Sequence, residues 1–538
     1  MANKNSDKKT IENENGEVVD YDQLLSSAGE FGRYQLFLFC TTFPFYVFAS
    51  FTYFGQMFLT ETSPNHWCFI PELQNLTVEE RRNLAIPSDA NSPFKYSLTP
   101  NQTWNTIPCQ HGWEYNKTEF PYPTIASEMG WVCERDSYQA TAQSMFFVGS
   151  IFGGFLIGFV ADRYGRLPAA VVSNMFGAIA GLASVFVTSF IPFVVCRFFV
   201  GMAYDNCMMM TYILVLEYVV PKHRTMMANL SFGIFFTIGA ISLPWIALAC
   251  GHWKTLGLVV SLPMFLSLLA PFIIPESPRW LLSKGRVDDA VSKVLTIARK
   301  NKKEVPQDLI DKFKTTLSNT KEVHGNVLDL VKRPIMRRMF ICACIEYMTS
   351  ILIFDALVRT IGQLQFDFFI SFAVISLTEL PSLILLSFVL DITGRKSMVI
   401  VTLIVCSVAC FVTPFVDAGI PAVICAVIAR FAMNMACNTC IQWSAEMIPA
   451  SVRGSGTSIV HTSGYIATVL APFVAYLETY KPWLPMIVVA SIAIFSALIA
   501  LTLPETAQKD LPQTMEESEN MVKSQGVFDF PFLNKKSI

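Results

Sequence analysis

Long apolar stretches separated by short polar segments dominate the chain. A helix needs about 20 predominantly apolar residues to cross the hydrocarbon core of a bilayer. Backbone groups inside that core find no water, so each stretch must form its own hydrogen bonds and is predicted to be helical. Twelve such windows begin near Tyr34, Ala140, Leu167, Pro192, Met226, Trp253, Met339, Asp367, Ser397, Pro421, Gly454 and Trp483. The pattern predicts an all-α membrane protein with twelve transmembrane helices.

Three short polar motifs occur twice, and one constant offset separates the two copies. The copies are Asp162-Arg-Tyr-Gly-Arg166 and Asp391-Ile-Thr-Gly-Arg395, Glu217 with Arg224 and Glu446 with Arg453, and Pro275-Glu-Ser277 and Pro504-Glu-Thr506. The differences 391 − 162, 446 − 217 and 505 − 276 all equal 229. A constant offset over three motifs indicates a duplicated chain. The helices are therefore expected to form two pseudo-symmetric six-helix bundles.

The polar segments between the windows divide the chain into parts. We expect an N-terminal tail over 1–32, a first bundle over 33–274 that includes a long loop over 58–139, a connecting loop over 275–338, a second bundle over 339–503 and a tail over 504–538. In the connecting loop, Val287, Ala290, Val291 and Val294 have helical spacing. This spacing predicts short amphipathic helices on the membrane face.

The placement of Lys and Arg predicts the orientation, because positive residues near membrane ends are retained in the cytoplasm. They occur beside both Asp-X-X-Gly-Arg motifs and throughout the connecting loop, which places both tails inside and the long loop outside. That loop holds three sequons, at Asn75, Asn101 and Asn116, which need lumenal exposure to be glycosylated. The plasma membrane is the leading location, with an endolysosomal membrane as the alternative.

The cysteines indicate at most a small disulfide framework. Of 14 cysteines, most lie in or beside predicted spans, where small apolar packing explains them. Cys68, Cys109 and Cys133 lie in the outer loop. One disulfide among these three is expected because that compartment is oxidising. The pairing and the fate of the third thiol stay open.

Composition supports a membrane protein and excludes several other classes. Hydrophobic residues make up 52% of the chain and charged residues 15%, and the net charge is −2. The basic stretches sit beside helices, so they do not indicate nucleic-acid binding. The sequence contains no Gly-X4-Gly-Lys-Ser/Thr phosphate loop, no His-Glu-X-X-His helix and no Gly-X-Ser-X-Gly elbow. We therefore expect neither an enzyme nor a cofactor.

The duplicated motifs are candidates for a gate. Gly165 and Gly394 permit a tight reversal between helices. The neighbouring charges can pair at helix ends in one state and separate in another; they are Asp162, Arg163, Arg166, Glu217, Arg224, Glu276, Arg279, Asp391, Arg395, Glu446 and Arg453. Exposed ion pairs contribute only ~0–1 kcal/mol each, which suits a reversible gate. The alternative is static anchoring of helix ends.

Several segments together resemble a known family. In order they are Gly29-Glu-Phe-Gly-Arg-Tyr-Gln35, Gly158-Phe-Val-Ala-Asp-Arg-Tyr-Gly-Arg166, Pro275-Glu-Ser-Pro-Arg-Trp280, Glu379-Leu-Pro381 and Leu503-Pro-Glu-Thr506. Over nearly the full length, the chain resembles the organic cation, organic anion and carnitine transporters of the major facilitator superfamily. The resemblance implies two bundles rocking around a central site, capped by the outer loop. Duplicated transporters generally bind substrate near the midplane.

Polar and aromatic residues inside the predicted spans are the candidates for substrate binding, because a charge at bilayer depth costs at least ~2.5–3.5 kcal/mol. We select Tyr212, Phe354, Asp355, Glu379, Asn438, Gln442, Trp443, His461 and Tyr465. Some have simpler explanations. Glu379 could satisfy backbone freed by Pro381, Asp355 could pair with Arg359 one turn onward, and Tyr212 could be core packing.

The residue at position 465 bears on the charge of the substrate. Cation-transporting members of the family usually have an acid, and anion and carnitine members an Arg, at the position that matches Tyr465. A phenol ring can still receive a cation, and Asp205, Glu346 and Asp355 add negative charge. We expect small organic cations or zwitterions, such as quaternary ammonium compounds or carnitine. An organic anion carrier would need Arg430 or a protonated His461.

Other properties are left as alternatives. Facilitated diffusion or exchange is the default mode of transport, and Glu379, Asp355 and His461 are the candidates if protons are coupled. A sensor that keeps a transporter fold without moving substrate is the alternative from another class. The expected partners are a small organic ion and the lipid bilayer, and a homo-oligomer stays open.

Overall fold

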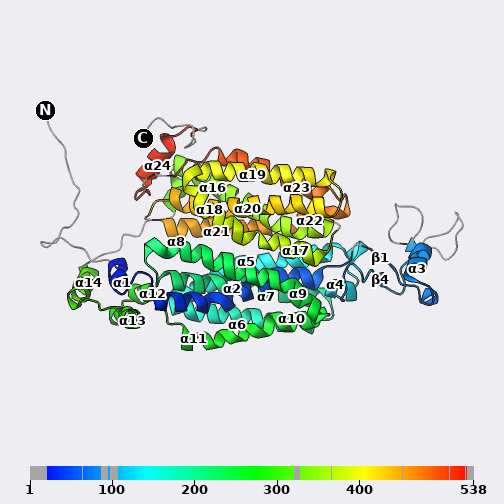
Figure 1. The fold of residues 1–538 in the computed structure, drawn as a ribbon, viewed down its shortest axis with the longest axis horizontal. Helices are drawn as coiled ribbons and strands as arrows, with labels where there is room; N and C mark the ends of the chain where they lie inside the picture. Colours follow the sequence, from blue (N-terminus) through cyan, green and yellow to red (C-terminus); the bar gives the residue numbers. More distant parts are fainter. Residues whose placement is uncertain are drawn as a thin grey trace.

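The computed structural model describes residues 21–63, 65–85, 95–96, 107–319, 328–364, 366–450, 452–507, 509, 511–526 and 529. The sequon at Asn101 lies outside these residues. Two helical bundles lie side by side, one from each half of the chain (Figure 1). Within the described residues, eleven helical spans are long and apolar enough to cross a membrane, and a shorter apolar helix, Leu484–Ala500, completes the set. The prediction of twelve helices in two bundles is confirmed.

The first bundle contains the spans before residue 274. Its elements are α2 (Arg33–Thr60), α5 (Ser137–Tyr164), α6 (Arg166–Val185), α7 (Phe190–Leu216), α8 (Pro221–Leu230), the π-helix η3 (Ser231–Phe236), α9 (Thr237–Cys250), α10 (Trp253–Ser261), the 3-10 helix η4 (Leu262–Leu269) and α11 (Ala270–Ile273). The sixth span changes from α to 3-10 at Leu262, where the following residue, Pro263, has no N–H to continue the α-helical ladder.

The second bundle repeats this arrangement. Its elements are α16 (Pro334–Arg359), η5 (Thr360–Leu364), α17 (Phe368–Leu377), α18 (Glu379–Thr393), α19 (Arg395–Val412), η6 (Thr413–Phe415), α20 (Ile420–Met447), α21 (Arg453–Thr468), α22 (Ala471–Tyr476), η7 (Leu477–Thr479) and α23 (Leu484–Ala500). The eighth span is interrupted between α17 and α18. Pro381 lacks the N–H that would bond to the Leu377 carbonyl, which explains the break there.

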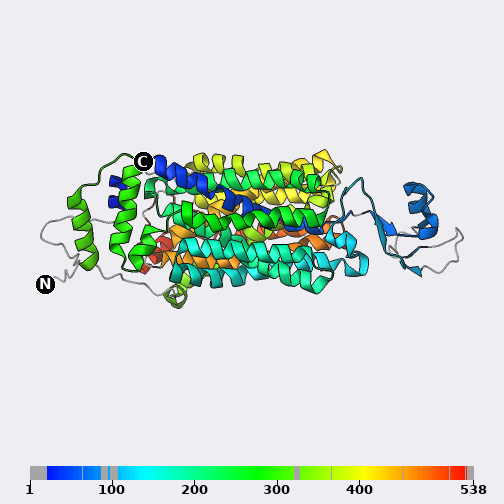
Figure 2. The same ribbon diagram turned by 90° about the horizontal axis from the view of Figure 1, so that it is seen from below.

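Smaller elements lie at the two ends of the bundles (Figure 2). At the motif end, which carries the duplicated motifs, are α1 (Tyr21–Ser27), α12 (Pro278–Ser283), α13 (Val287–Lys300), α14 (Gln307–Asn319), α15 (Leu328–Lys332) and α24 (Met515–Lys523). At the opposite, loop end are β1 (His66–Cys68), η1 (Pro71–Leu73), α3 (Val78–Ala85), β2 (Lys95–Tyr96), β3 (Ile107–Pro108), β4 (Trp113–Tyr115), α4 (Ile125–Glu128) and η2 (Cys133–Arg135). Helices were expected in the connecting loop, and α13 buries Ala290, Val291 and Val294.

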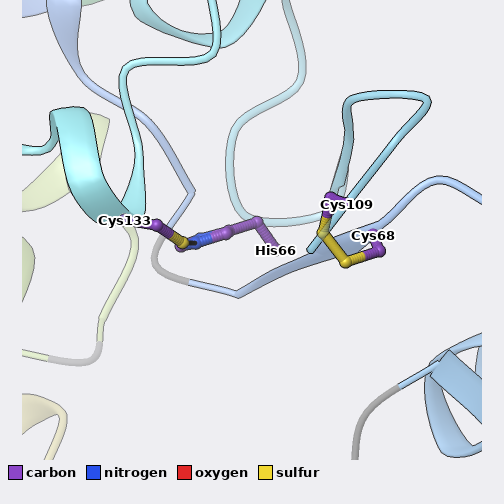
Figure 3. The surroundings of a disulfide bond; sticks show 4 residues. All are labelled: His66, Cys68, Cys109 and Cys133. Atoms are coloured by element: carbon purple, nitrogen blue, oxygen red, sulfur yellow. Dashed lines mark hydrogen bonds between the residues drawn. A yellow bond between two sulfur atoms is a disulfide. The ribbon is translucent and has the colours of Figure 1, made fainter. Parts of the chain in front are cut away.

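The long loop is folded around two short antiparallel strand pairs. Strand β1 pairs with β4, and β2 pairs with β3. A disulfide joins Cys68 to Cys109 (Figure 3). The third loop cysteine, Cys133, places its Sγ 3.5 Å from His66 Nε2. The two described sequon asparagines differ, since Asn75 is exposed and Asn116 is half-buried.

The hydrophobic cores are distributed unevenly between the two ends. One core near the loop end contains residues of both halves, including Phe54 and Phe58 of α2 and Phe372 of α17. The other large cores each belong to one half. One contains Leu214 of α7 with Ile297 of α13, and another contains Met336 of α16 with Leu503. The two halves are thus packed together mainly at the loop end.

Within the first half, α5 and α7 cross at backbone contact. A Cβ added at Gly149 would lie 1.9 Å from the Phe198 carbonyl oxygen, and one added at Gly201 would lie 1.8 Å from the Phe146 carbonyl oxygen. Such distances are possible only for glycine, and small residues commonly permit this close approach of membrane helices.

We expect Gly201→Val to prevent stable packing of the first half. Overpacking in a well-packed interior costs ~1–3 kcal/mol, and here the added atoms meet backbone that has no alternative rotamer. Surface protein measured by biotinylation should fall sharply. The matched control is Gly154→Val on α5, where an added Cβ meets nothing within 4 Å. Normal surface expression of Gly201→Val would contradict the close crossing.

Candidate substrate site and gates

The centre of the molecule holds a carboxylate between the two halves. Asp205 lies in the middle of α7 and is half-buried. Its carboxylate lies beside the hydroxyl of Tyr465 on α21, across the interface between the halves. It also interacts electrostatically with Tyr204 of its own helix and Tyr347 of α16. The second half therefore supplies phenols and the first half supplies the charge.

Aromatic rings continue on both sides of Asp205. On the second half, the ring of His461 lies 5.7 Å from that of Tyr347 and 5.3 Å from that of Tyr465. On the first half, Tyr204 stacks on Tyr53 of α2 at 4.9 Å. Such rings can receive a cation on their faces. We call the set of Asp205, Tyr204, Tyr347, His461 and Tyr465 the central cluster.

Two other intramembrane carboxylates are neutralised by arginines. Glu379 Oε1 lies 2.9 Å from Arg430 Nη2, and both side chains are buried. The Arg430 guanidinium also lies over the ring of Phe354, 3.5 Å from its centroid. Glu379 was expected to bind substrate or to satisfy backbone near Pro381; in this structure its carboxylate pairs with Arg430.

Asp355 takes part in a polar contact between the halves. Arg359, one turn onward, binds Asp355 Oδ2 through Nε at 2.6 Å. Tyr53 of α2 donates its hydroxyl proton to Asp355, and Arg359 donates to the side chain of Gln143 on α5. Pairing with Arg359, one of the two alternatives for Asp355, is present. We call Tyr53, Gln143, Asp355 and Arg359 the inter-half latch.

Aromatic side chains close the interface between the latch and the long loop. The ring of Phe372 lies 5.1 Å from that of Phe54 and 5.0 Å from that of Phe58. The ring of Phe120, from the long loop, lies 5.3 Å from that of Phe369. Each contact joins one half to the other, so apolar packing and the latch together close the loop end.

The remaining predicted substrate residues lie elsewhere. Asn438 is half-buried on α20 and donates to the Asn434 carbonyl oxygen at 2.8 Å. Gln442 donates to Glu446 at 3.0 Å, and Trp443 is buried with its Nε1 donating to the Pro504 carbonyl oxygen at 2.9 Å. Both of these contacts connect to motif residues. Tyr212 is half-buried and packs against the loop-end core.

Of the nine predicted residues, the structure thus places His461 and Tyr465 in the central cluster, whereas Phe354 and Glu379 both contact Arg430. Asp205 is an acid within a predicted span but is not among the nine predicted residues, and neither are Tyr53, Tyr204 and Tyr347. The apolar spans also contain other tyrosines. Only the placement of α7 opposite α16 and α21 distinguishes the tyrosines near Asp205 from the rest. The adjacent pair Tyr204-Asp205 near the middle of a mainly apolar helix was the available signal.

The motif turns have the same chemistry in both halves. In the first half, Glu276 accepts hydrogen bonds from the backbone N–H groups of Arg166 at 3.0 Å and Leu167 at 3.2 Å. In the second, Glu505 accepts from those of Arg395 at 2.9 Å and Lys396 at 3.1 Å. Each acid thus caps the N-terminus of the helix after the turn, where unpaired N–H groups favour negative charge.

Further contacts of the motif residues are repeated as well. Asp162 pairs with Arg166 at 2.7 Å, and Asp391 pairs with Arg395 at 2.9 Å. Ser277 donates to Glu217, and Thr506 donates to Glu446 at 2.5 Å. The Gly165 and Gly394 turns have φ values of 117° and 84°, a region that favours glycine.

The two halves differ in how their remaining arginines are held. In the first half, Arg224 and Arg279 both bind Asp22 of α1. One contact is shared, since Arg224 Nε donates to the Val219 carbonyl oxygen at 2.9 Å and Arg453 Nε donates to that of Ile448 at 3.1 Å. In the second half, however, Arg453 Nη2 donates to the Pro512 carbonyl oxygen at 3.2 Å, and Arg395 also pairs with Glu446 at 3.0 Å. Arg163 is exposed, over the Tyr164 ring. Each of these motif contacts joins groups of one half.

The described part of the chain has twelve apolar helical segments in two bundles, with a charged and aromatic site between them. These features define a multi-pass membrane transporter of the major facilitator fold. Among solved structures, the proton:xylose symporter XylE bound to 6-bromo-6-deoxy-D-glucose has a TM-score of 0.58 and 15% identity, covering 93% of this chain and 100% of that chain. At that identity the likeness shows the fold alone.

Comparison with known sequences shows the family. The sugar (and other) transporter family matches residues 101–517. The beta-alanine transporter of Drosophila melanogaster is 27% identical, with 93% of this chain and 89% of that protein covered. Solute carrier family 22 member 3 of Rattus norvegicus is 29% identical, with 94% and 96% covered. The carcinine transporter of Drosophila melanogaster is 27% identical, with 94% and 80% covered.

The chain belongs to the sugar (and other) transporter family and, within the major facilitator superfamily, to the organic cation, organic anion and carnitine transporters. It is a transmembrane transporter of organic ions and not an enzyme.

We expect Tyr53→Phe to weaken closure of the loop end. The variant removes the hydroxyl that reaches Asp355 from the other half, and a hydrogen bond to a charged group contributes ~1.5–3 kcal/mol. Spin labels at the exposed loop-end residues Lys254 and Asp417, one on each half, would report the opening as a longer distance population. Tyr34→Phe, near the motif end of the same helix, is the control. An unchanged distance distribution in Tyr53→Phe would contradict the latch.

Closure of the loop end should also depend on pH through Glu61, which follows α2. Burial is the main cause that raises the pKa of Glu61 to about 8; Glu478 and Asp136 also raise it, whereas Arg359 and Gln139 lower it. An exposed Glu has a pKa near ~4.3, so the closed state binds the proton more tightly than an open state would. Closure is therefore favoured as pH falls from about 8, and this contribution is lost above about 8.

The same spin-label pair tests this pH dependence. The closed population should increase between pH 8.5 and pH 6 in the unmodified chain, and Glu61→Gln should flatten that change because Gln cannot titrate. A pH response that persists undiminished in Glu61→Gln would assign it to another group.

Proposed function

We propose that this protein carries small organic cations or zwitterions across the plasma membrane by alternating access. The observation that carries the proposal is the central cluster, where a carboxylate and three phenols from both halves meet at mid-span. An acid surrounded by aromatic rings attracts an ammonium group through charge and through the ring faces. Quaternary ammonium compounds and carnitine are the first compounds to examine.

The distribution of contacts between the halves supports alternating access. At the loop end, the latch and the ring contacts join the halves. At the motif end, the repeated ion pairs and caps stay within each half. This is the arrangement expected of a state closed at the loop end. We propose that the motif residues, from Asp162 to Arg453, form contacts between the halves in the opposite state.

The distribution of Lys and Arg supports an orientation of the protein in the membrane. The motif end, with the connecting loop and both tails, faces the cytoplasm, and the long loop faces outward, where its disulfide and sequons are chemically suited. In that orientation the described conformation faces inward. For a monovalent cation, the membrane potential favours entry by ~2.3 kcal/mol per 100 mV.

An anion carrier receives less support from the contacts. Arg430 is paired with Glu379, and Arg359 is paired with Asp355. Neither guanidinium is left without a counter-charge in this conformation. His461 lies beside two phenols. Carboxylates are therefore included in the uptake test below only to distinguish an anion carrier from a cation carrier.

Uptake in a cell that lacks such carriers tests the proposal. Labelled tetraethylammonium, carnitine and an aromatic carboxylate would be supplied at two membrane potentials and two external pH values. We expect saturable uptake of tetraethylammonium or carnitine, with the cation falling on depolarisation. Carboxylate uptake alone would overturn the proposal in favour of an anion carrier. No uptake of any of the three, with the protein at the surface, would favour a sensor.

A reversible cross-link between the two halves tests alternating access. Ser144 Oγ of α5 lies 2.8 Å from the Val469 carbonyl oxygen, just after α21, so these two positions are neighbours at the seam. A cross-link between cysteines placed at both positions should abolish uptake, and its reduction should restore it. Uptake that survives full cross-linking would contradict alternating access.

A further inference from the structure

The intramembrane acids of this chain differ in whether a basic side chain is paired with them. Asp355 and Glu379 are buried and paired with Arg359 and Arg430. Glu346 is 1% exposed, and the carboxylate contact that the structure shows is with Cys440 of the same half at 3.8 Å. Asp205 is half-buried at the interface, and within the described residues no Lys or Arg lies within ion-pair distance of it.

An unpaired carboxylate at this depth needs a physical explanation. A charge in the middle of a span costs at least ~2.5–3.5 kcal/mol, and such residues normally face a cavity or a partner. The neighbours of Asp205 are phenols, which can donate a hydrogen bond to it but cannot neutralise it. A cation that entered the seam from solution would supply this counter-charge.

The neighbours also limit what the cation can be. Tyr204, Tyr347 and Tyr465 come from three helices, and His461 continues the aromatic surface. Aromatic faces bind ammonium groups well because they need not replace a tightly held hydration shell. Small inorganic cations prefer several oxygen ligands instead, and no group of three or more His, Cys, Asp and Glu suited to a metal occurs among the described residues.

We propose that Asp205 is the residue that determines substrate charge, binding the ammonium group of an organic amine or quaternary ammonium compound against the phenols of the second half. This inference rests on the proposed function and refines it by assigning the selecting charge to helix α7 of the first half. The Tyr465 hydroxyl donates a hydrogen bond to the Asp205 carboxylate when no cation is present. The ammonium group displaces this hydroxyl when it binds.

The contact between Asp205 and Tyr465 has a testable consequence. Because the two side chains meet across the interface, a carboxylate at position 465 would face the same space between α7 and α21 from the opposite side, set back by the length of the phenol ring that it replaces. The negative charge can therefore be moved from α7 to α21 with two substitutions. A residue that only supports packing would not tolerate this exchange.

The experiment compares Asp205→Asn, Asp205→Asn combined with Tyr465→Asp, and the unmodified chain, using tetraethylammonium uptake normalised to surface protein. We expect Asp205→Asn to lower kcat/KM at least tenfold, mainly through a higher KM, and the double variant to recover most of that loss. Glu346→Gln is the matched control, since it removes a buried acid away from the interface, and its KM should stay unchanged.

Each result either supports or overturns the inference. An unchanged KM in Asp205→Asn overturns it while the proposed function stands. A loss that Tyr465→Asp fails to restore assigns Asp205 a structural role and also overturns it. If Asp205→Asn fails to reach the surface, the double variant decides, because cation uptake by it supports the inference and its inactivity at the surface overturns it. No cation uptake by the unmodified chain is a failure of the proposed function itself.

Discussion

The cost of charge in hydrocarbon constrains this structure more than any other interaction. Backbone groups satisfy that constraint by forming helices, and side chains satisfy it by pairing. Arg430 with Glu379 and Arg359 with Asp355 are two such pairs, both on the second half and both buried. Their arrangement leaves Asp205 as a charge that faces the interface. Among Asp205, Asp355 and Glu379, pairing with an arginine therefore distinguishes the two scaffold acids from the acid of the proposed site.

The architecture could be predicted from the sequence because its signals are strong and local. Hydropathy windows marked the spans, and the 229-residue offset marked the duplication. The motif contacts are repeated as the offset implies, with Glu276 and Glu505 capping equivalent turns. The family assigned from the resemblance is shown by the comparisons.

The site was harder to predict, since it depends on which faces of distant helices meet. Sequence spacing put Gln442 and Trp443 on the same stripe as Asn438, but their polar atoms bond toward the motif end. Asp355 could be interpreted in two ways, and only the tertiary structure shows its contact with Tyr53 from the other half. Periodicity identifies a face of a helix, whereas contacts between halves decide its role.

The tail helices have a mechanical consequence. Asp22 of α1 is bound to arginines of the first half, and Ser518 of α24 donates to the Met447 carbonyl oxygen of the second half at 2.8 Å. Each tail helix is thus fastened to a different half of the molecule. Under the alternating access proposed above, a rotation of one bundle against the other would change the distance between α1 and α24.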